Sequence, residues 1–288
     1  MSPTIQAFFD EATFTVSYLV SDPVSRRAVI IDPVLDFDPG PARTSTQSAQ
    51  ALLSAADAEK LSIDWILETH AHADHLSAAA FLKEKTGAKV AIGERIKDIQ
   101  KVFGPIFGAN DVTGDGAPFD RLLKDGDVLQ VGGMRIEVLH TPGHTPACVS
   151  YHIGENVFVG DTLFMPDYGT ARADFPGGDA RALYRSIRRI LSLPDETALW
   201  MCHDYKTPGR EGFAWRTTVA EERRENVQVR DGISEEDFVA RRIARDRTLR
   251  VPTLILPSVQ VNIRAGQMPP AGPDGRVYLQ LPVNRLGG

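Results

Sequence analysis

The heptapeptide Thr69-His70-Ala71-His72-Ala73-Asp74-His75 holds three of the seven histidines of the chain and one aspartate, directly behind the apolar run Ile63-Asp64-Trp65-Ile66-Leu67. Side chains two positions apart do not share a helical face, so His70 and His72 are predicted to lie on a loop that leaves a strand. Neutral imidazole and carboxylate are usual ligands of zinc and non-haem iron. The stretch therefore predicts a metal site at the end of a buried strand.

Three later segments place another ligand-type side chain at the end of an apolar run. They are Gly143-His144, Val159-Gly160-Asp161 and Cys202-His203. Taken in order, the HxHxDH motif of residues 70–75, the Gly-His pair, the Gly-Asp pair and the late histidine resemble the metallo-β-lactamase superfamily. The resemblance implies an αβ/βα sandwich of two mixed sheets flanked by helices.

Periodicity along the chain also predicts an α/β fold, because runs of period two alternate with helical patterns. The predicted strands are residues 13–20, 28–32, 63–67, 89–93, 128–131, 134–139, 148–153, 157–159 and 199–201. The first predicted helix is capped by Ser45 and buries Ala49, Leu52, Leu53 and Ala56. The others are residues 76–85, 94–103, a helix from the cap Asp179 to Leu193, 214–229, and 234–249. Gly87 is expected to stop the helix 76–85, and Ser234 to cap the helix 234–249. Residues 36–43, 104–118 and 162–178 are predicted loops, and a loop as long as the last one, beside a site, is usually functional.

Composition indicates an ordinary soluble protein. A length of 288 residues with 42% hydrophobic content allows one domain over 1–288, with a helical and extended part, 210–288, packed on it. No run approaches the roughly 18 apolar residues of a membrane span, and residues 1–6 lack a secretory pattern, so we expect a cytoplasmic protein with no membrane partner. The net charge of −6 disfavours nucleic acid as a partner. A homodimer is allowed.

The ligand-type residues permit two chemistries. His70, His72 and His144 can form one metal pocket and Asp74, His75 and His203 a second, with Asp161 bridging them. Such a two-metal centre suits hydrolysis of a thioester, as in glyoxalase II, where two metals stabilise the developing oxyanion. A binding protein that has lost turnover is disfavoured, because all seven candidate ligands are present.

Several further segments extend the pattern of the histidine motif along the chain: Gly143-His144-Thr145-Pro146, Gly160-Asp161, residues 169–175, Cys202-His203-Asp204-Tyr205 and residues 259–266. Together they resemble the persulfide dioxygenases, the ethylmalonic-encephalopathy-protein-like branch of the superfamily. Residues 165–168 look like the longer insertion of the bacterial members. This insertion departs from the mitochondrial pattern and leaves the thiol contacts open.

This resemblance implies one Fe(II) per chain, held by His70, His144 and Asp161. Two histidines and one carboxylate form a facial triad that leaves positions for sulfur, dioxygen and water. The implied reaction oxidises glutathione persulfide with O2 and water to sulfite and glutathione. The residues expected to orient ligands and water around the triad are His72, Asp74, His75 and His203.

Several other residues near these motifs also have expected roles. Arg172 resembles the family arginine that holds a glutathionyl carboxylate, and Tyr205 resembles a tyrosine that lines the substrate site. Asp204 is predicted to fix a loop. Two sets are expected to be structural: the cysteines Cys148 and Cys202, as small buried apolar groups, and the histidines His140 and His152.

Overall fold

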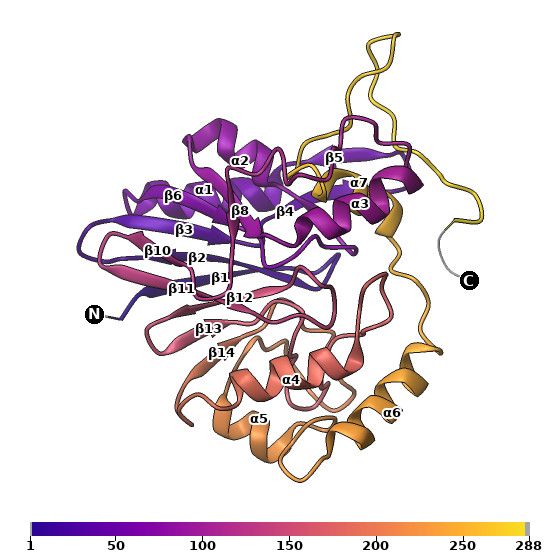
Figure 1. Cartoon of the computed structure of the whole chain (residues 1–288). Coiled ribbons are helices and arrows are strands. Elements are labelled where there is room, and N and C mark those ends of the chain that lie inside the picture. Colours follow the sequence, from indigo (N-terminus) through magenta and orange to yellow (C-terminus); the bar gives the residue numbers. More distant parts are fainter. Residues whose placement is uncertain (1, 286–288) are drawn as a thin grey trace.

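The computed structural model describes residues 2–285, which form four layers: helices, a sheet, a second sheet and helices (Figure 1). The first sheet contains, in spatial order, β1 (Thr4–Asp10), β2 (Thr15–Ser21), β3 (Arg27–Ile31), β6 (Ser62–Leu67), β8 (Lys89–Gly93) and β9 (Arg121–Leu123). The second contains β10 (Val128–Val131), β11 (Met134–His140), β12 (Val149–Ile153), β13 (Asn156–Phe158), β14 (Ala198–Trp200) and β15 (Arg216–Thr218). Both sheets are mixed, since β3, β6, β8 and β9 pair parallel in the first and β13 and β14 in the second. The predicted sandwich is confirmed.

The alternation of side chains along β2 explains why this strand is buried on both faces. Val16, Tyr18 and Val20 point toward the second sheet, where they pack in one cluster with residues such as Tyr151. Leu19 points the other way and packs beneath the helices on the outer face. Each fully buried side chain of this size contributes roughly 1.5–3 kcal/mol to folding.

The helices cover the two outer faces of the sandwich (Figure 1). They are α1 (Gln47–Ala58), α2 (Ala79–Thr86), α3 (Ile96–Ile106), α4 (Ala180–Ile190), α5 (Val219–Glu225), α6 (Glu235–Asp246) and α7 (Ile255–Asn262). Three predicted helix boundaries are confirmed. Asp179 caps α4, Ser234 caps α6, and Gly87 ends α2 with a left-handed conformation.

The N-terminal half contains strands that the sequence did not predict. β1 and β9 are additional edge strands, and the predicted loop at 36–43 is wrong because β4 (Val34–Asp38) and β5 (Arg43–Ser45) pair there as a hairpin. Ser45 ends β5 and does not cap α1. The Asp36 carboxylate, on β4, accepts hydrogen bonds from the Ser48 backbone N–H and hydroxyl at 3.1 and 2.6 Å, so a tertiary contact supplies the cap.

Several helix ends also differ from prediction. Residues Leu76–Ser77 form β7, which pairs with β4, and α2 begins only at Ala79. The predicted helix 214–229 is shorter, because Thr218 and Glu221 form a capping box that starts α5 and Asn226 ends it. α3 begins and ends two to three residues later than predicted and includes Pro105.

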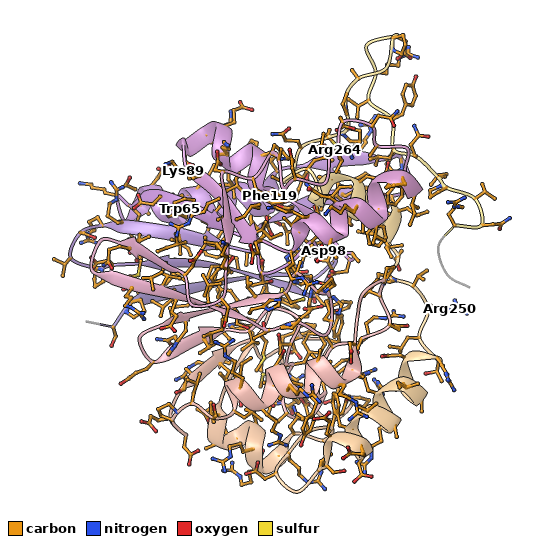
Figure 2. All side chains as sticks on the ribbon, in the orientation of Figure 1. Trp65, Lys89, Asp98, Phe119, Arg250 and Arg264 are labelled. Carbon is orange, nitrogen blue, oxygen red and sulfur yellow. The ribbon has the colours of Figure 1, made fainter. Side chains whose placement is uncertain are left out.

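The C-terminal part packs against the helices on both outer faces of the sandwich. Phe238 of α6 packs with the α4 cluster, and Val261 of α7 packs with α1 and α2. Arg264, labelled in Figure 2, pairs with Asp111 at 2.7 Å. The segment after α7 extends away from the layers without regular structure (Figure 1). No helix in the described part of the chain has the length and apolar character needed to cross a membrane.

Candidate metal centre

The histidine motif forms the loop that leaves the carboxyl end of β6. The Asp32 carboxylate accepts hydrogen bonds from the Thr69 backbone N–H at 2.7 Å and from its hydroxyl at 2.8 Å. Asn262 Nδ2, from α7, donates to the backbone carbonyls of His72 and His75, both at 2.8 Å. The loop is therefore held by one residue that precedes it in the sequence, Asp32, and by one that follows it, Asn262, as a preorganised site requires.

One group of potential ligands consists of His70, His144 and Asp161, all buried. Asp161 Oδ2 lies 3.9 Å from His70 Nε2 and 3.6 Å from His144 Nε2. The glycine before His144 is needed for close packing, because a Cβ on Gly143 would lie 2.3 Å from the backbone of Leu183. The structure brings together these three side chains, which the resemblance to the persulfide dioxygenases implies as ligands of one metal. His72, expected from the ligand types to share a pocket with His70 and His144, lies with the other group instead.

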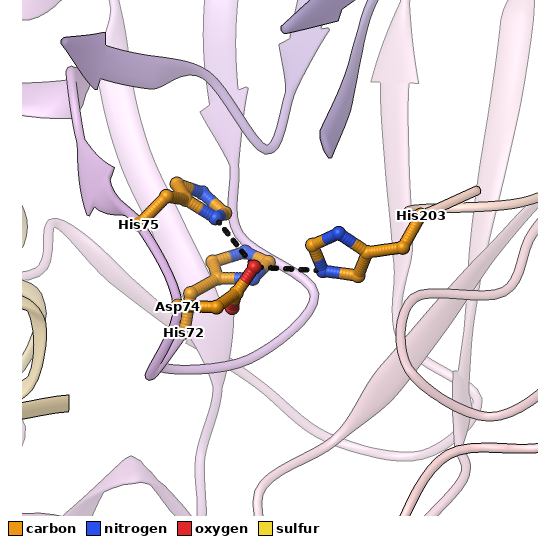
Figure 3. A group of neighbouring side chains, drawn as sticks. All are labelled: His72, Asp74, His75 and His203. Carbon is orange, nitrogen blue, oxygen red and sulfur yellow. Dashed lines mark ion pairs between the residues drawn. The ribbon is translucent and has the colours of Figure 1, made fainter. Parts of the chain in front are cut away.

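A second group consists of His72, Asp74, His75 and His203 (Figure 3). Asp74 Oδ2 lies 3.2 Å from His203 Nε2 and 3.5 Å from His75 Nδ1. The other oxygen of Asp161, Oδ1, lies 3.4 Å from His203 Nε2. Asp161 therefore lies between the two groups, as a bridging ligand would.

The hydrogen bonds of the imidazoles leave one nitrogen of each open. The bonded nitrogens are His70 Nδ1 with Thr69 Oγ1 (3.0 Å), His72 Nε2 with Asp32 Oδ1 (3.0 Å), His144 Nδ1 with the Arg172 carbonyl (2.8 Å), and His75 Nδ1 and His203 Nδ1, each with Thr15 Oγ1 (3.3 Å). Within residues 2–285, six buried atoms of the two ligand groups have no hydrogen-bond partner: His70 Nε2, His72 Nδ1, His75 Nε2, His203 Nε2, Asp74 Oδ2 and Asp161 Oδ1. Buried polar atoms are normally satisfied, so this donor set fits metal ions.

Burial and neighbouring charge shift the pKa values in the centre. Burial, reinforced by the nearby His72 and His144, lowers the pKa of His70 well below its usual value, which keeps this imidazole neutral as coordination requires. Burial opposes ionisation of Asp74, but the facing His203 and His75 lower its pKa overall. Burial likewise opposes charge on His72, yet the Asp32 carboxylate raises the pKa of His72 well above its usual value.

A cavity of about 500 Å³ opens onto the centre. His144, Asp161 and Asp74 line its floor, and Phe14, Phe164 and Phe175 are among its apolar walls. Tyr205 also lines it and stacks on His203 with ring centroids 5.5 Å apart. Arg172 lines it as well, but its guanidinium pairs with Asp174 at 2.6 Å.

The residues that were expected to be structural lie outside the two ligand groups described above. Asp204 accepts hydrogen bonds from Arg210 and from the backbone N–H of Ala214 at 2.7 Å, so it fixes a loop as predicted. Both cysteines are buried. Burial raises the pKa of Cys148 to about 12 and that of Cys202 well above its usual value, so both thiols are protonated at neutral pH. Neither His140 nor His152 belongs to a potential ligand group in the described residues.

The sequence reasoning missed the residues that hold the ligands from behind. Thr15 joins His75 to His203, and Asp32 joins Thr69 to His72. A carboxylate directly after the strand run 28–31 was a usable signal for Asp32. Thr15 carried none, because its role depends on contacts 60 and 188 positions away in the sequence.

Comparison with known proteins identifies the family. The family model described as metallo-beta-lactamase superfamily matches residues 11–203. The chain belongs to this superfamily. The metal-ligand groups of the structure all fall inside the matched region.

Several curated proteins are similar over most of the chain. A protein of Burkholderia pseudomallei named probable metallo-hydrolase is 53% identical over 98% of this chain and 100% of its own length. Glyoxylase B2 of Dictyostelium discoideum is 44% identical over 98% and 97%. Human mitochondrial persulfide dioxygenase ETHE1 is 30% identical over 92% and 90%. The chain spans only 66% of a beta-lactamase hydrolase-like protein of Xylella fastidiosa, at 48% identity.

Solved structures of the superfamily are also similar. ETHE1 from Myxococcus xanthus has a TM-score of 0.74 and 33% identity, covering 92% of this chain and 100% of that one. A protein crystallised in a di-iron-bound form has a TM-score of 0.55 and 28% identity, covering 79% and 99%. This chain is therefore a metal-binding enzyme of the superfamily, similar both to hydrolases and to persulfide dioxygenases.

Proposed function

We propose that the protein is an Fe(II)-dependent persulfide dioxygenase that converts glutathione persulfide, O2 and water into sulfite and glutathione. One iron per chain is held by His70, His144 and Asp161. The observation that carries the proposal is the convergence of these two imidazoles and one carboxylate, of which His144 and Asp161 line the 500 Å³ cavity. The similarity to ETHE1 from Myxococcus xanthus along the full length of that protein supports it.

Iron held by His70, His144 and Asp161 would supply open positions for sulfur and dioxygen and a redox-active centre through which electrons pass from the persulfide sulfur to dioxygen. The chain's own residues orient the ligands and shape the cavity. The Arg172 carbonyl and Thr69 Oγ1 fix the rings of His144 and His70 through their Nδ1 atoms. Phe175 lies edge-on to His144 at 5.1 Å and excludes water from that side of the site.

Glyoxalase II-type hydrolysis of a thioester by two metals is the second candidate. The specific observation that favours it is the second ligand group, whose four side chains are complete and whose donor atoms are unpartnered. The similarity to glyoxylase B2 and to the protein named probable metallo-hydrolase agrees with it.

Metal analysis combined with oxygen uptake tests the proposal. Protein produced with iron available is expected to contain about one iron per chain and to consume O2 when glutathione persulfide is added. Two zinc ions per chain, thioester hydrolysis and no oxygen uptake would establish the second candidate instead.

A pair of matched variants separates the two ligand groups. Asp161→Asn is expected to lose iron, because the amide removes the only carboxylate of the triad. Asp74→Asn is expected to retain iron, since Asp74 belongs to the second group. Depletion of metal by both changes would support the dinuclear centre.

A further inference from the structure

The cavity above the candidate metal centre has a strongly cationic wall. Four arginines line it: Arg172, Arg242, Arg245 and Arg250. The only acidic side chains among its lining residues are Asp74 and Asp161, and both belong to the ligand groups. Apart from the ligand carboxylates, the charged side chains that an entering molecule meets in the cavity are therefore all cationic.

Two of these arginines are already engaged by the protein. Arg172 forms a two-point ion pair with Asp174, at 2.6 and 2.8 Å, and donates to the backbone carbonyl of Arg250. Arg242 is buried and pairs with Asp246 at 2.6 Å, while its Nη1 donates to the carbonyl of Thr170. Their partners hold the loop 162–178 in place, so these two guanidinium groups act as structural supports.

The other two arginines are free. Within residues 2–285, the guanidinium groups of Arg245 and Arg250 have no ion pair and no hydrogen bond. Both residues are exposed, Arg245 on the last turn of α6 and Arg250, labelled in Figure 2, on the segment that follows. An unpaired guanidinium on a cavity wall is available for a planar carboxylate, which it can bind through two parallel hydrogen bonds.

Aromatic rings connect one of these cations with the metal centre. The Arg245 guanidinium lies 5.9 Å from the ring centroid of Tyr168. Tyr168 lies 5.1 Å from Tyr205, which stacks on His203. An extended molecule lying along these rings has one end at Arg245 and the other at the ligand groups.

We propose that Arg245 and Arg250 determine specificity by binding the carboxylates of an anionic, thiol-derived substrate whose sulfur reaches the centre at His144 and Asp161. This inference rests on the proposed function for the chemistry at the sulfur, but the carboxylate contacts do not depend on that chemistry. The cavity volume of about 500 Å³ is within the range of sites that enclose molecules of tripeptide size.

The test compares Arg245→Gln and Arg250→Gln with Arg241→Gln. Arg241 is exposed on the same helix and lines a neighbouring hollow, which Arg245 also borders, but it does not line this cavity, which makes it a matched control. With glutathione persulfide, each of the two cavity variants is expected to raise KM about tenfold or more, as expected for loss of a charge-assisted hydrogen bond, with kcat changed less than about twofold. Arg245→Lys is expected to recover part of the loss, because it restores the charge without the planar geometry.

A substrate with masked carboxylates supplies the second comparison. The persulfide of glutathione diethyl ester should have a raised KM with the wild-type protein and no further rise with Arg245→Gln. Equal KM values for the wild type, the cavity variants and the control would overturn the proposal. The proposal would also be overturned if Arg245→Gln raised the KM for the ester by the same factor as it raises the KM for glutathione persulfide.

Calorimetric titration with S-methylglutathione separates this inference from the proposed function, because it needs no turnover. The dissociation constant is expected to rise about tenfold in both cavity variants and to stay unchanged in Arg241→Gln. If that rise is found while the wild type consumes no O2, the carboxylate contacts stand and the dioxygenase proposal fails. If O2 is consumed and the dissociation constant does not change, the carboxylate contacts fail alone.

Discussion

Replacing Glu222 by glutamine is expected to remove a pH dependence from the stability of the protein. Glu222 on α5 is buried, and burial raises its pKa from 4.5 to about 8, although the hydrogen bond from Asn226 Nδ2 at 2.6 Å opposes the shift. Between pH 4.5 and about pH 8, Glu222 keeps its proton in the folded chain and releases it in the unfolded chain. The free energy of unfolding therefore falls as pH rises. At about 1.4 kcal/mol per pH unit, and less near pH 8 where the folded chain also begins to release this proton, the loss between pH 5 and pH 8 is about 3.5 kcal/mol.

Urea unfolding at several pH values measures this effect. The free energy of unfolding of the wild type minus that of Glu222→Gln should decrease by about 3.5 kcal/mol from pH 5 to pH 8, because glutamine does not titrate. Taking the difference cancels the titration of the metal-ligand groups, which both proteins share. Glu225→Gln on the same helix is the control, since the Glu225 side chain is 56% exposed. A difference that stays constant over this range would refute the reasoning.

Three further changes test the packing and hydrogen bonds around the centre. Gly143→Ala should cost about 3 kcal/mol or more in urea unfolding, because its Cβ meets the Leu183 backbone at 2.3 Å, whereas Gly87→Ala, with nothing within 4 Å, should cost only about 1 kcal/mol. Asp32→Asn should lower the free energy of unfolding by about 3 kcal/mol and reduce bound metal in elemental analysis, because one carboxylate holds both Thr69 and His72. Cys148→Ala should leave kcat within about twofold of the wild type, since a buried thiol with a pKa of about 12 is no nucleophile; a larger loss would assign the thiol a part in turnover.

Local signals in the sequence predicted the parts of the fold that local contacts determine. The cap at Asp179 works through its own backbone neighbours, and Gly87 adopts the left-handed conformation that ends a helix. The cap of α1 could not be predicted in this way. It comes from Asp36, on a strand that pairs with β5 and β7, so both the strand and the cap depend on contacts between segments.

The candidate ligands were predictable for a similar reason. Each follows a strand, and strands that run in the same direction end at the same edge of a sheet, so ligand types at several strand ends indicate a shared site. The residues that orient the ligands could not be found in the same way. Asn262 joins the carbonyls of His72 and His75 across 190 and 187 positions, and nothing in its immediate sequence marks it for that contact.

The metal ligands and the unpaired arginines of the cavity lie on opposite sides of residue 203 in the sequence, where the match to the superfamily ends. Every member of the two ligand groups lies at or before His203, in the region that matches the superfamily. The free arginines Arg245 and Arg250 lie beyond it, as do Arg242 and Asp246, which support the cavity loop. In these proposals the region that matches the superfamily supplies the metal ligands, while α6 and the segment after it supply three of the four arginines on the cavity wall. Substrate choice among relatives should therefore vary with the residues aligned with 242–250 more than with the metal ligands.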